Sequence, residues 1–159
     1  MINISNKIII DADACPKTVR IITKEISEKY DIAVWATSSF NSIIEDFTNT
    51  IIVGDEKDAT DIKIFNESKN NDIVITKDLR LAAMLTVKGI KVITPYGFLY
   101  RDDKMDMHLE RSYINRKFRD AGGKSRIPVH TIKDDDKFRK VLEKCVLRLE
   151  DSNLRQIAI

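Results

Sequence analysis

The sequence is poor in cysteine, and its two cysteines lie far apart. Cys15 and Cys145 are separated by most of the chain, and neither belongs to a Cys-x-x-Cys motif or to a Cys/His cluster. This arrangement argues against a structural zinc site and against a framework of disulfides. The two thiols therefore favour a reducing compartment.

Long apolar runs are also lacking. No run approaches the roughly 18 residues that a membrane-spanning helix needs. The first ten residues, MINISNKIII, lack the basic start, the sustained apolar segment and the small-residue cleavage site of a secretory signal. We therefore expect a cytoplasmic protein that does not enter a membrane.

A strong excess of charge of either sign is absent as well. The net charge is +2, which is too small to indicate a nucleic-acid-binding protein unless the charges form local clusters. A chain of 159 residues with 43% hydrophobic and 33% charged residues is typical of one globular domain. We expect a single domain over residues 1–159, and its oligomeric state stays open.

Strand and helix patterns alternate over the first 96 residues. Continuous apolar runs, typical of strands buried on both faces of a parallel sheet, occur at 7–11, 32–37, 50–54, 72–76 and 90–95. Helical patterns lie between them at 16–30, 57–69 and 78–89. This alternation predicts an α/β fold, a three-layer α/β/α sandwich with a mainly parallel central sheet.

Beyond residue 96 the pattern becomes helical. Residues 105–121 can form an amphipathic helix, and residues 134–151 can form a further helix with apolar side chains along one side. Some 60 residues with few apolar runs make a marginal independent domain. We therefore expect 97–159 to be a helical C-terminal extension that packs on an α/β core of residues 1–96.

Aspartates follow three of the predicted strands. They are Asp11 and Asp13 after the first strand, Asp55, Asp58 and Asp61 after the third, and Asp78 after the fourth. Ligands of open parallel sheets bind outside the carboxyl ends of the strands. Carboxylates that converge there stay ionised only if a cation compensates them, and hard oxygen ligands suit Mg²⁺ or Mn²⁺. The pattern therefore predicts a divalent-metal site.

Each aspartate taken alone also has a structural explanation. Aspartate is a preferred helix N-cap and turn residue, and Asp78 is placed as the N-cap of the helix at 78–89. Asp11 differs because it ends an apolar strand, where an unpaired buried charge is costly. For Asp11 we therefore favour a functional role.

The first functional hypothesis is a metal-dependent nuclease. Asp11, Asp61 and Asp78 would hold the metal and act as the catalytic acids, so that a metal-bound water attacks a phosphodiester. Asp13 and Asp58 would bind a second metal or orient the water. Such chemistry needs no histidine, and the two histidines, His108 and His130, fall outside the predicted sheet, where we expect them to be surface or packing residues.

Two other readings stay open. A strand that ends in Asp-x-Asp, here Asp11 to Asp13, also resembles the nucleophile motif of haloacid-dehalogenase-type aspartyl phosphotransferases. Thr37 or Thr76 and Lys77 would then complete the site, although ITKD supplies one acid where two are usual. The third reading is a nucleic-acid-binding regulatory module that performs no chemistry.

Positive charge gathers in one segment, RSYINRKFRDAGGKSR, which carries a single acid. Its cations are Arg111, Arg116, Lys117, Arg119, Lys124 and Arg126. Phosphate contacts supply most non-specific affinity for nucleic acid, and the interleaved Tyr113 and Phe118 can stack on bases. We expect nucleic acid to bind here, RNA more than DNA, although a solvated helix face would show the same pattern.

Several motifs together resemble the YaiI/YqxD family of largely uncharacterised bacterial proteins. They are IDADACP at 10–16, VGDEKDATDIKI at 53–64 and NDIVITKDLRLA at 71–82, followed by the arginine-rich stretch with its Gly-Gly. The similarity covers about residues 8–149. The family is grouped with the PIN-like nucleases, so the resemblance implies a parallel α/β/α sandwich with clustered acids that bind Mg²⁺ or Mn²⁺. It points to Asp11, Asp61 and Asp78, with Asp13 and Asp58 adjacent.

Cys15 belongs to the first of these motifs and has two interpretations. It precedes Pro16 at a predicted helix start, where a small, buried, apolar residue suits the packing. A helix N-terminus can also lower the pKa of a thiol, which would make Cys15 redox-sensitive.

Overall fold

The computed structural model describes residues 6–39, 49–53, 59–123 and 129–157, with a five-stranded sheet at its centre. The strands are β1 (Lys7–Ile10), β2 (Ala33–Ser39), β3 (Asn49–Val53), β4 (Ile73–Ile75) and β5 (Lys91–Ile93). Their order is β3-β2-β1-β4-β5, and all four pairings are parallel. The predicted parallel sheet is confirmed. The chain adds strands on one side of β1 and then returns to its other side, so the order reverses between β1 and β4.

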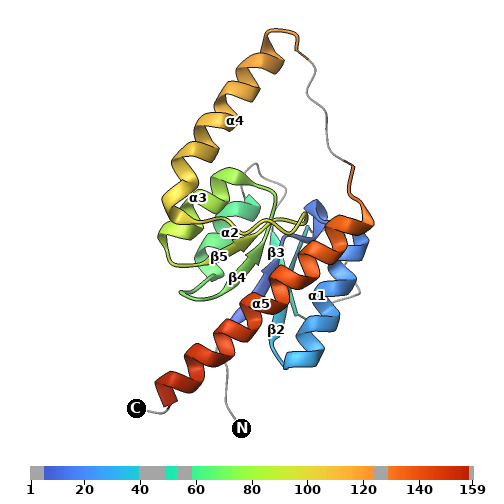
Figure 1. Cartoon of the computed structure of the whole chain (residues 1–159), viewed down its shortest axis with the longest axis vertical. Helices are drawn as coiled ribbons and strands as arrows, with labels where there is room; N and C mark the ends of the chain where they lie inside the picture. The colour runs from blue at the N-terminus through green and yellow to red at the C-terminus, as the bar shows by residue number, and fades with distance from the viewer. Residues whose placement is uncertain (1–5, 40–48, 54–58, 124–128, 158–159) are drawn as a thin grey trace.

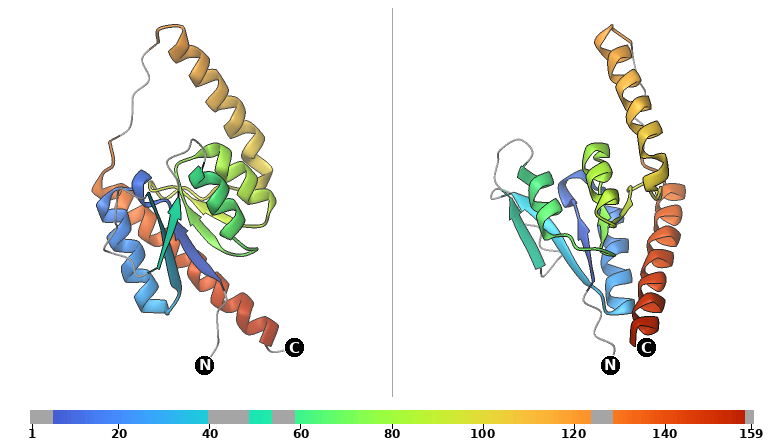
Figure 2. Two further views of the ribbon diagram at one scale, coloured as in Figure 1. Left: turned by 180° about the vertical axis from the view of Figure 1, so that it is seen from behind. Right: turned by 90° about the vertical axis from the view of Figure 1, so that its left-hand side faces the viewer.

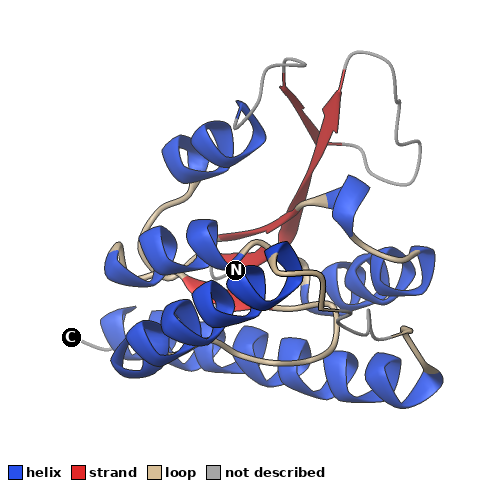
Figure 3. Cartoon of the chain, turned by 90° about the horizontal axis from the view of Figure 1, so that it is seen from above, coloured by secondary structure: helices blue, strands red, loops and turns tan. Residues whose placement is uncertain are grey.

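Helices cover both faces of this sheet, as the views from the side and from above show (Figures 1, 2 and 3). They are α1 (Lys17–Tyr30), α2 (Ala59–Glu67), α3 (Leu79–Val87), α4 (Met105–Asp120) and α5 (Ile132–Ile157), with short 3-10 turns η1 (Ala12–Ala14) and η2 (Asp102–Lys104). Helices α1 and α5 lie on one face, and α2 and α3 lie on the other. The fold is therefore the expected three-layer α/β/α sandwich. Within the described helices, none is long and apolar enough to span a membrane.

The three isoleucines of β1 explain why this strand is central. Ile8 and Ile10 point into the apolar layer that α1 and α5 cover, whereas Ile9 points into the layer that α2 and α3 cover. All three side chains are fully buried. Because successive side chains of a strand point to opposite faces, a strand between two helical layers needs apolar residues at every position.

The two C-terminal helices differ in how they pack. Phe138 and Leu142 of α5 are fully buried in the same core as Ile8, and Tyr30 of α1 donates a hydrogen bond of 2.6 Å to Glu143 at its edge. In α4 the only buried side chain is that of Met105. In Figures 1 and 2 the first turns of α4 lie beside α3 and the rest of the helix projects beyond the sandwich.

Helix boundaries differ from the sequence patterns by one or two residues at most ends and by six at the end of α5. Pro16 is the N-cap of α1 and not its first residue, because its ψ of 153° is extended. Helix α5 begins two residues earlier and ends six residues later than the predicted 134–151. The expected stop at Gly89 is confirmed by its φ of +85°, a conformation that glycine adopts without strain, although α3 itself ends at Val87.

Candidate metal and nucleic-acid site

Asp11 and Asp78 lie at the place in the sheet where ligands are expected. Asp11 directly follows β1, and Asp78 follows β4, which is the neighbour of β1. The strand order reverses between these two strands, and such a switch point opens a crevice at the carboxyl ends of the strands. The two aspartates therefore flank the crevice.

Two threonines hold the carboxylate of Asp11 between them. The hydroxyl of Thr76 donates to Asp11 Oδ2 at 3.4 Å, and Thr37 Oγ1 lies 3.5 Å from Asp11 Oδ1. Both threonines are almost fully buried: Thr37 lies in β2 and Thr76 directly follows β4, the two strands beside β1. The same Thr76 hydroxyl accepts a hydrogen bond of 3.1 Å from the N–H of Asp78. Thr76 therefore connects the two aspartates.

Asp78 is the N-cap of α3, as predicted. Its Oδ1 accepts the backbone N–H groups of Arg80 and Leu81 at 2.9 and 3.1 Å. Its Oδ2 takes no part in this cap. The structural role of Asp78 is thus carried by one oxygen, which leaves a metal-binding role possible for the other.

The remaining predicted acids are not all placed. Asp61 is half-buried in the first turn of α2, whose preceding strand β3 is two strands away from β1. Asp58 lies outside the described residues, and so does the side chain of Asp13, whose backbone is part of η1. Within the part of the chain that the structure describes, no three acidic, histidine or cysteine side chains are close enough to form a metal site. Among the predicted acids that the structure describes, Asp11 and Asp78 are linked through Thr76.

Cys15 lies close to Asp11 but belongs to the core. Its side chain packs with the isoleucines of β1, and burial together with the negative charge of Asp11 raises the pKa of the thiol to about 12. Lys77 and Arg20 act in the opposite direction, which places two cations near the acidic edge. This environment favours the interpretation of Cys15 as a buried apolar residue over that of a reactive thiol.

A first prediction concerns the reactivity of Cys15. At pH 8 a pKa of about 12 leaves roughly a thousandfold less thiolate than the ordinary pKa of 9.0. We expect iodoacetamide to modify Cys15 about a thousandfold more slowly in the native protein than in urea, as peptide mass spectrometry can measure. Because the folded state keeps its proton longer, the stability that this thiol contributes is lost as the pH rises from 9 towards 12. Comparable rates in both states would contradict the burial.

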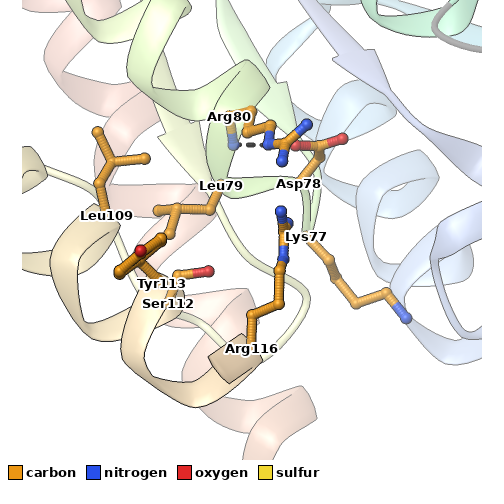
Figure 4. A pocket seen from close by; sticks show the side chains of 8 residues that line it. All are labelled: Lys77, Asp78, Leu79, Arg80, Leu109, Ser112, Tyr113 and Arg116. Carbon is orange, nitrogen blue, oxygen red and sulfur yellow. Dashed lines mark hydrogen bonds between the residues drawn. The ribbon is translucent and has the colours of Figure 1, made fainter. Parts of the chain in front are cut away.

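The acidic edge opens into a pocket between α3 and α4 (Figure 4). Its volume is about 500 Å³, and its lining consists of Lys77, Asp78, Leu79, Arg80, Leu109, Ser112, Tyr113 and Arg116. Figure 4 shows the side chain of Arg116 reaching from α4 towards the loop that carries Lys77 and Asp78. Three cations and one carboxylate therefore line the same pocket, an arrangement that can receive a phosphodiester beside a metal-binding group.

A second pocket of about 320 Å³ shares Leu79 and Ser112 with the first. Its further lining residues are Tyr100, His108, Arg111, Asn115 and Arg119. The rings of Phe98, Tyr100 and His108 contact one another edge-to-face at 5.2 to 5.4 Å between centroids. Burial and the charge of Asp78 raise the pKa of Tyr100, so this tyrosine stays neutral beside the acidic edge.

The arginines of the predicted basic segment that lie on α4 line two different pockets. Arg116 lines the first pocket, Arg111 and Arg119 line the second, and the ammonium of Lys117 lies 5.3 Å from the ring of Tyr113. Lys124 and Arg126 fall outside the described residues. Arg116 therefore faces the acidic edge, and Arg111 and Arg119 lie around the neighbouring second pocket.

The two aromatic residues of that segment, Tyr113 and Phe118, also have different surroundings. Tyr113 lines the first pocket, whereas Phe118 lies over Gly123 after the helix, where an added Cβ would come within 2.3 Å of the phenyl ring. Only Tyr113 is thus placed to stack on a base near Asp78.

Sequence reasoning missed Tyr100 and gave Thr37 and Thr76 a role only in the phosphotransferase reading. Thr76 directly follows β4, so the positional rule that selected the aspartates could have selected it, whereas Thr37 lies inside β2 and Tyr100 bonds back to Val92 of β5. His108 packs in the ring cluster, and Nε2 of His130 lies 3.0 Å from the carbonyl of Pro95. Both histidines therefore have packing contacts, as expected.

Comparison with known proteins places the chain among bacterial relatives of unestablished function. The family described as "Uncharacterized BCR, YaiI/YqxD family" matches residues 9–148. A "UPF0178 protein" of Heliobacterium modesticaldum is 36% identical over 138 residues, which are 86% of this chain and 94% of the relative. The "UPF0178 protein" of Alkaliphilus metalliredigens is 39% identical over 140 residues, covering 86% and 89%. No solved structure gives a significant match.

Proposed function

The chain belongs to the YaiI/YqxD family, and from the geometry of its acidic edge we propose that it is a metal-dependent nuclease that hydrolyses phosphodiester bonds of RNA or DNA. One observation carries the proposal. The Thr76 hydroxyl joins the carboxylate of Asp11 to the backbone N–H of Asp78 at the switch point of a parallel sheet, and Asp78 lines a pocket together with three cations. The PIN-like resemblance of the acid-bearing motifs supports the same reaction. The two free, buried cysteines fit a cytoplasmic location.

Asp11 and Asp78 are the residues that would hold Mg²⁺ or Mn²⁺. The donor set fits a hard cation, because it consists of carboxylate oxygens that neutral threonine hydroxyls orient. Asp61, Asp13 and Asp58 are proposed as further ligands or as residues that position the attacking water. When bound, the metal supplies an activated water and polarises the phosphate.

The chain's own cations position the substrate. Arg116 reaches into the first pocket from α4, where it can hold a phosphate beside the scissile bond, and Lys77 lines the same pocket from the loop after β4. Arg111 and Arg119 continue the positive surface along α4 into the second pocket. None of these contacts selects a sequence, so we expect binding that depends on salt and tolerates many sequences, with RNA preferred to DNA.

The proposal is tested by calorimetric titration of Mn²⁺ into the wild-type protein and into Asp78→Asn. Asparagine keeps the N-cap but removes the charge, so we expect α3 to stay folded while Mn²⁺ affinity falls at least about tenfold. Cleavage of a labelled single-stranded RNA by the same samples should fall with it. Asp136→Asn, on the exposed start of α5, is the matched control. Unchanged Mn²⁺ binding by Asp78→Asn would remove this residue from the site, and Mn²⁺ binding without cleavage would leave a binding module.

Reversing Arg116 and Arg119 to glutamate should weaken nucleic-acid binding and flatten its salt dependence. Each phosphate contact on a single strand contributes about 0.7 to the slope of log K against log salt, so losing two lowers the slope by about 1.4. Fluorescence anisotropy of a labelled RNA in EDTA measures this without cleavage. The control reverses Lys133 and Lys140, which are exposed on α5. An equal slope in both double variants would remove this face of α4 from the interface.

One contact favours a second candidate, an aspartyl phosphotransferase. Thr37 lies in β2, the strand next to β1, and approaches Asp11, as a phosphate-binding threonine would in that chemistry. In this case Asp11 becomes transiently phosphorylated. Beryllofluoride, which mimics an aspartyl phosphate, would then bind with Mg²⁺ in the wild type and not in Asp11→Asn, and no RNA would be cleaved.

A further inference from the structure

Helix α4 exposes an apolar stripe. Met107, Ile114 and Phe118 are spaced by seven and four residues, which places them on one side of an α-helix. Their exposed fractions are 45%, 57% and 57%. A monomeric protein has little reason to align three large apolar side chains in water, so such a stripe indicates an interaction surface.

This stripe points away from the rest of the protein. The residues that face α3 across the first pocket are Leu109, Ser112 and Arg116, and they lie on the opposite side of α4. The sandwich therefore leaves the stripe uncovered within the described residues. Figures 1 and 2 show the far end of α4 projecting beyond the sandwich, while its first turns lie beside α3.

Helix α4 also has little packing against the rest of the chain that the structure describes. Of its sixteen residues only Met105 is buried, and its main contacts are with α3 and η2 near its first turns. Isolated helices of this length are marginal in water, and most helices are stabilised by packing of an apolar face. A partner on the stripe would supply that packing.

We propose that the stripe binds the same stripe of a second copy of the chain, with the two α4 helices antiparallel and Ile114 on the twofold axis. The charges beside the stripe are complementary for this arrangement. Glu110 and Lys117 lie on the same border of the stripe, seven residues apart. Antiparallel pairing about Ile114 sets Glu110 level, within one residue, with Lys117 of the partner subunit, and the contact occurs twice.

The opposite border fits as well. Arg111 comes level, within one residue, with Phe118 of the partner subunit, where a guanidinium can lie over the ring. On the border that carries Glu110 and Lys117, no like charges oppose each other. Helix α4 carries four cations and three acids, so a chance arrangement could have placed like charges in contact. This complementarity favours a second copy over a membrane or an unrelated peptide as the occupant of the stripe.

The dimer leaves the candidate site open. Arg116 lies on the side of α4 that faces Asp78, so each subunit keeps its own first pocket, and only Arg111 of the second pocket borders the interface. The pairing does not depend on the proposed nuclease function. An interface of one helix pair is small, so we expect a reversible dimer with a dissociation constant of about 1 to 100 µM.

Sedimentation velocity of the full chain from about 5 to about 200 µM tests the proposal without metal or nucleic acid. The wild type should pass from monomer to dimer, and Ile114→Asp should stay monomeric. Glu110→Lys and Lys117→Glu each place two pairs of like charges in contact, so each should raise the dissociation constant about tenfold. The double variant that carries both changes should return to within about threefold of the wild type.

Glu28→Lys, on the exposed side of α1, is the control for a change of net charge, and circular dichroism establishes that each variant is folded. A wild type that is monomeric at all concentrations would overturn the proposal. So would a dimer that Ile114→Asp leaves intact, or single reversals that behave like Glu28→Lys. If the monomer instead bound anionic lipid vesicles and Ile114→Asp removed that binding, the stripe would belong to a membrane surface.

Discussion

Replacing Asp72 by alanine is expected to lower the free energy of unfolding by about 3 kcal/mol, because it leaves Lys7 beside an apolar strand without its counter-charge. Asp72 is fully buried at the start of β4, and its Oδ2 lies 2.8 Å from the ammonium of Lys7. The same carboxylate accepts the backbone N–H groups of Lys7 and Lys69 at 3.0 and 2.8 Å. It therefore ties β1 to β4 at the amino edge of the sheet.

The backbone contacts and the ion pair can be separated. In Lys7→Met the carboxylate loses its counter-charge but keeps its N–H donors, so we expect a smaller loss of about 1 to 2 kcal/mol. Urea unfolding followed by circular dichroism measures both variants and the double variant, with Asp136→Ala on the surface of α5 as the control. An Asp72→Ala variant as stable as Asp136→Ala would show that water reaches this carboxylate in the folded protein.

Asp72 and Asp78 illustrate what the spacing of acids in a sequence can reveal. Both flank the short strand β4, yet one is a buried structural carboxylate at the amino edge and the other lines a pocket at the carboxyl edge. The rule that ligands bind after parallel strands selected Asp78 and passed over Asp72. The partner of Asp72 could not be predicted, because pairing Lys7 with it requires knowing that β1 and β4 are neighbours.

The layers of the fold were predictable, but the strand order was not. The run Ile8–Ile10 indicated a strand buried on both faces, and the structure confirms it. Local patterns carry no information on which strands pair, and so the switch point between β1 and β4 entered only with the structure. That switch point is what turns Asp11 and Asp78 from two strand-end acids into neighbours.

Helix α4 shows a different limit. Its positive charge and its two aromatic residues were visible in the sequence, and so was the spacing of five residues that puts Tyr113 and Phe118 on different sides. What the sequence left open was which side meets the sandwich, since the helix has too few apolar residues to define one core-facing stripe. The pocket lined by Arg116 and Tyr113 answers that question.

Asp11→Asn should lower the rate of metal-dependent cleavage by about a thousandfold or more, the largest effect that we expect from one substitution. Removing a metal-binding carboxylate costs several kcal/mol of transition-state stabilisation. Because each 1.36 kcal/mol is a factor of ten in rate, about 4 kcal/mol corresponds to the thousandfold decrease. Asparagine has the same shape and can keep the contacts with Thr37 and Thr76. We therefore expect the thermal unfolding temperature in EDTA to change little.

A structural role for Asp11 would produce a different pattern, and Cys15 supplies the readout that separates the two. The charge of Asp11 helps to raise the pKa of that thiol, so Asp11→Asn should speed alkylation of Cys15 while the fold stays intact. If Asp11→Asn shows slow cleavage, faster alkylation of Cys15 and an unchanged unfolding temperature, then cleavage needs the charge of Asp11 and the fold does not. Slow cleavage with a large drop in unfolding temperature would mean that Asp11 holds the strand ends together, and cleavage at the wild-type rate would exclude Asp11 from the reaction.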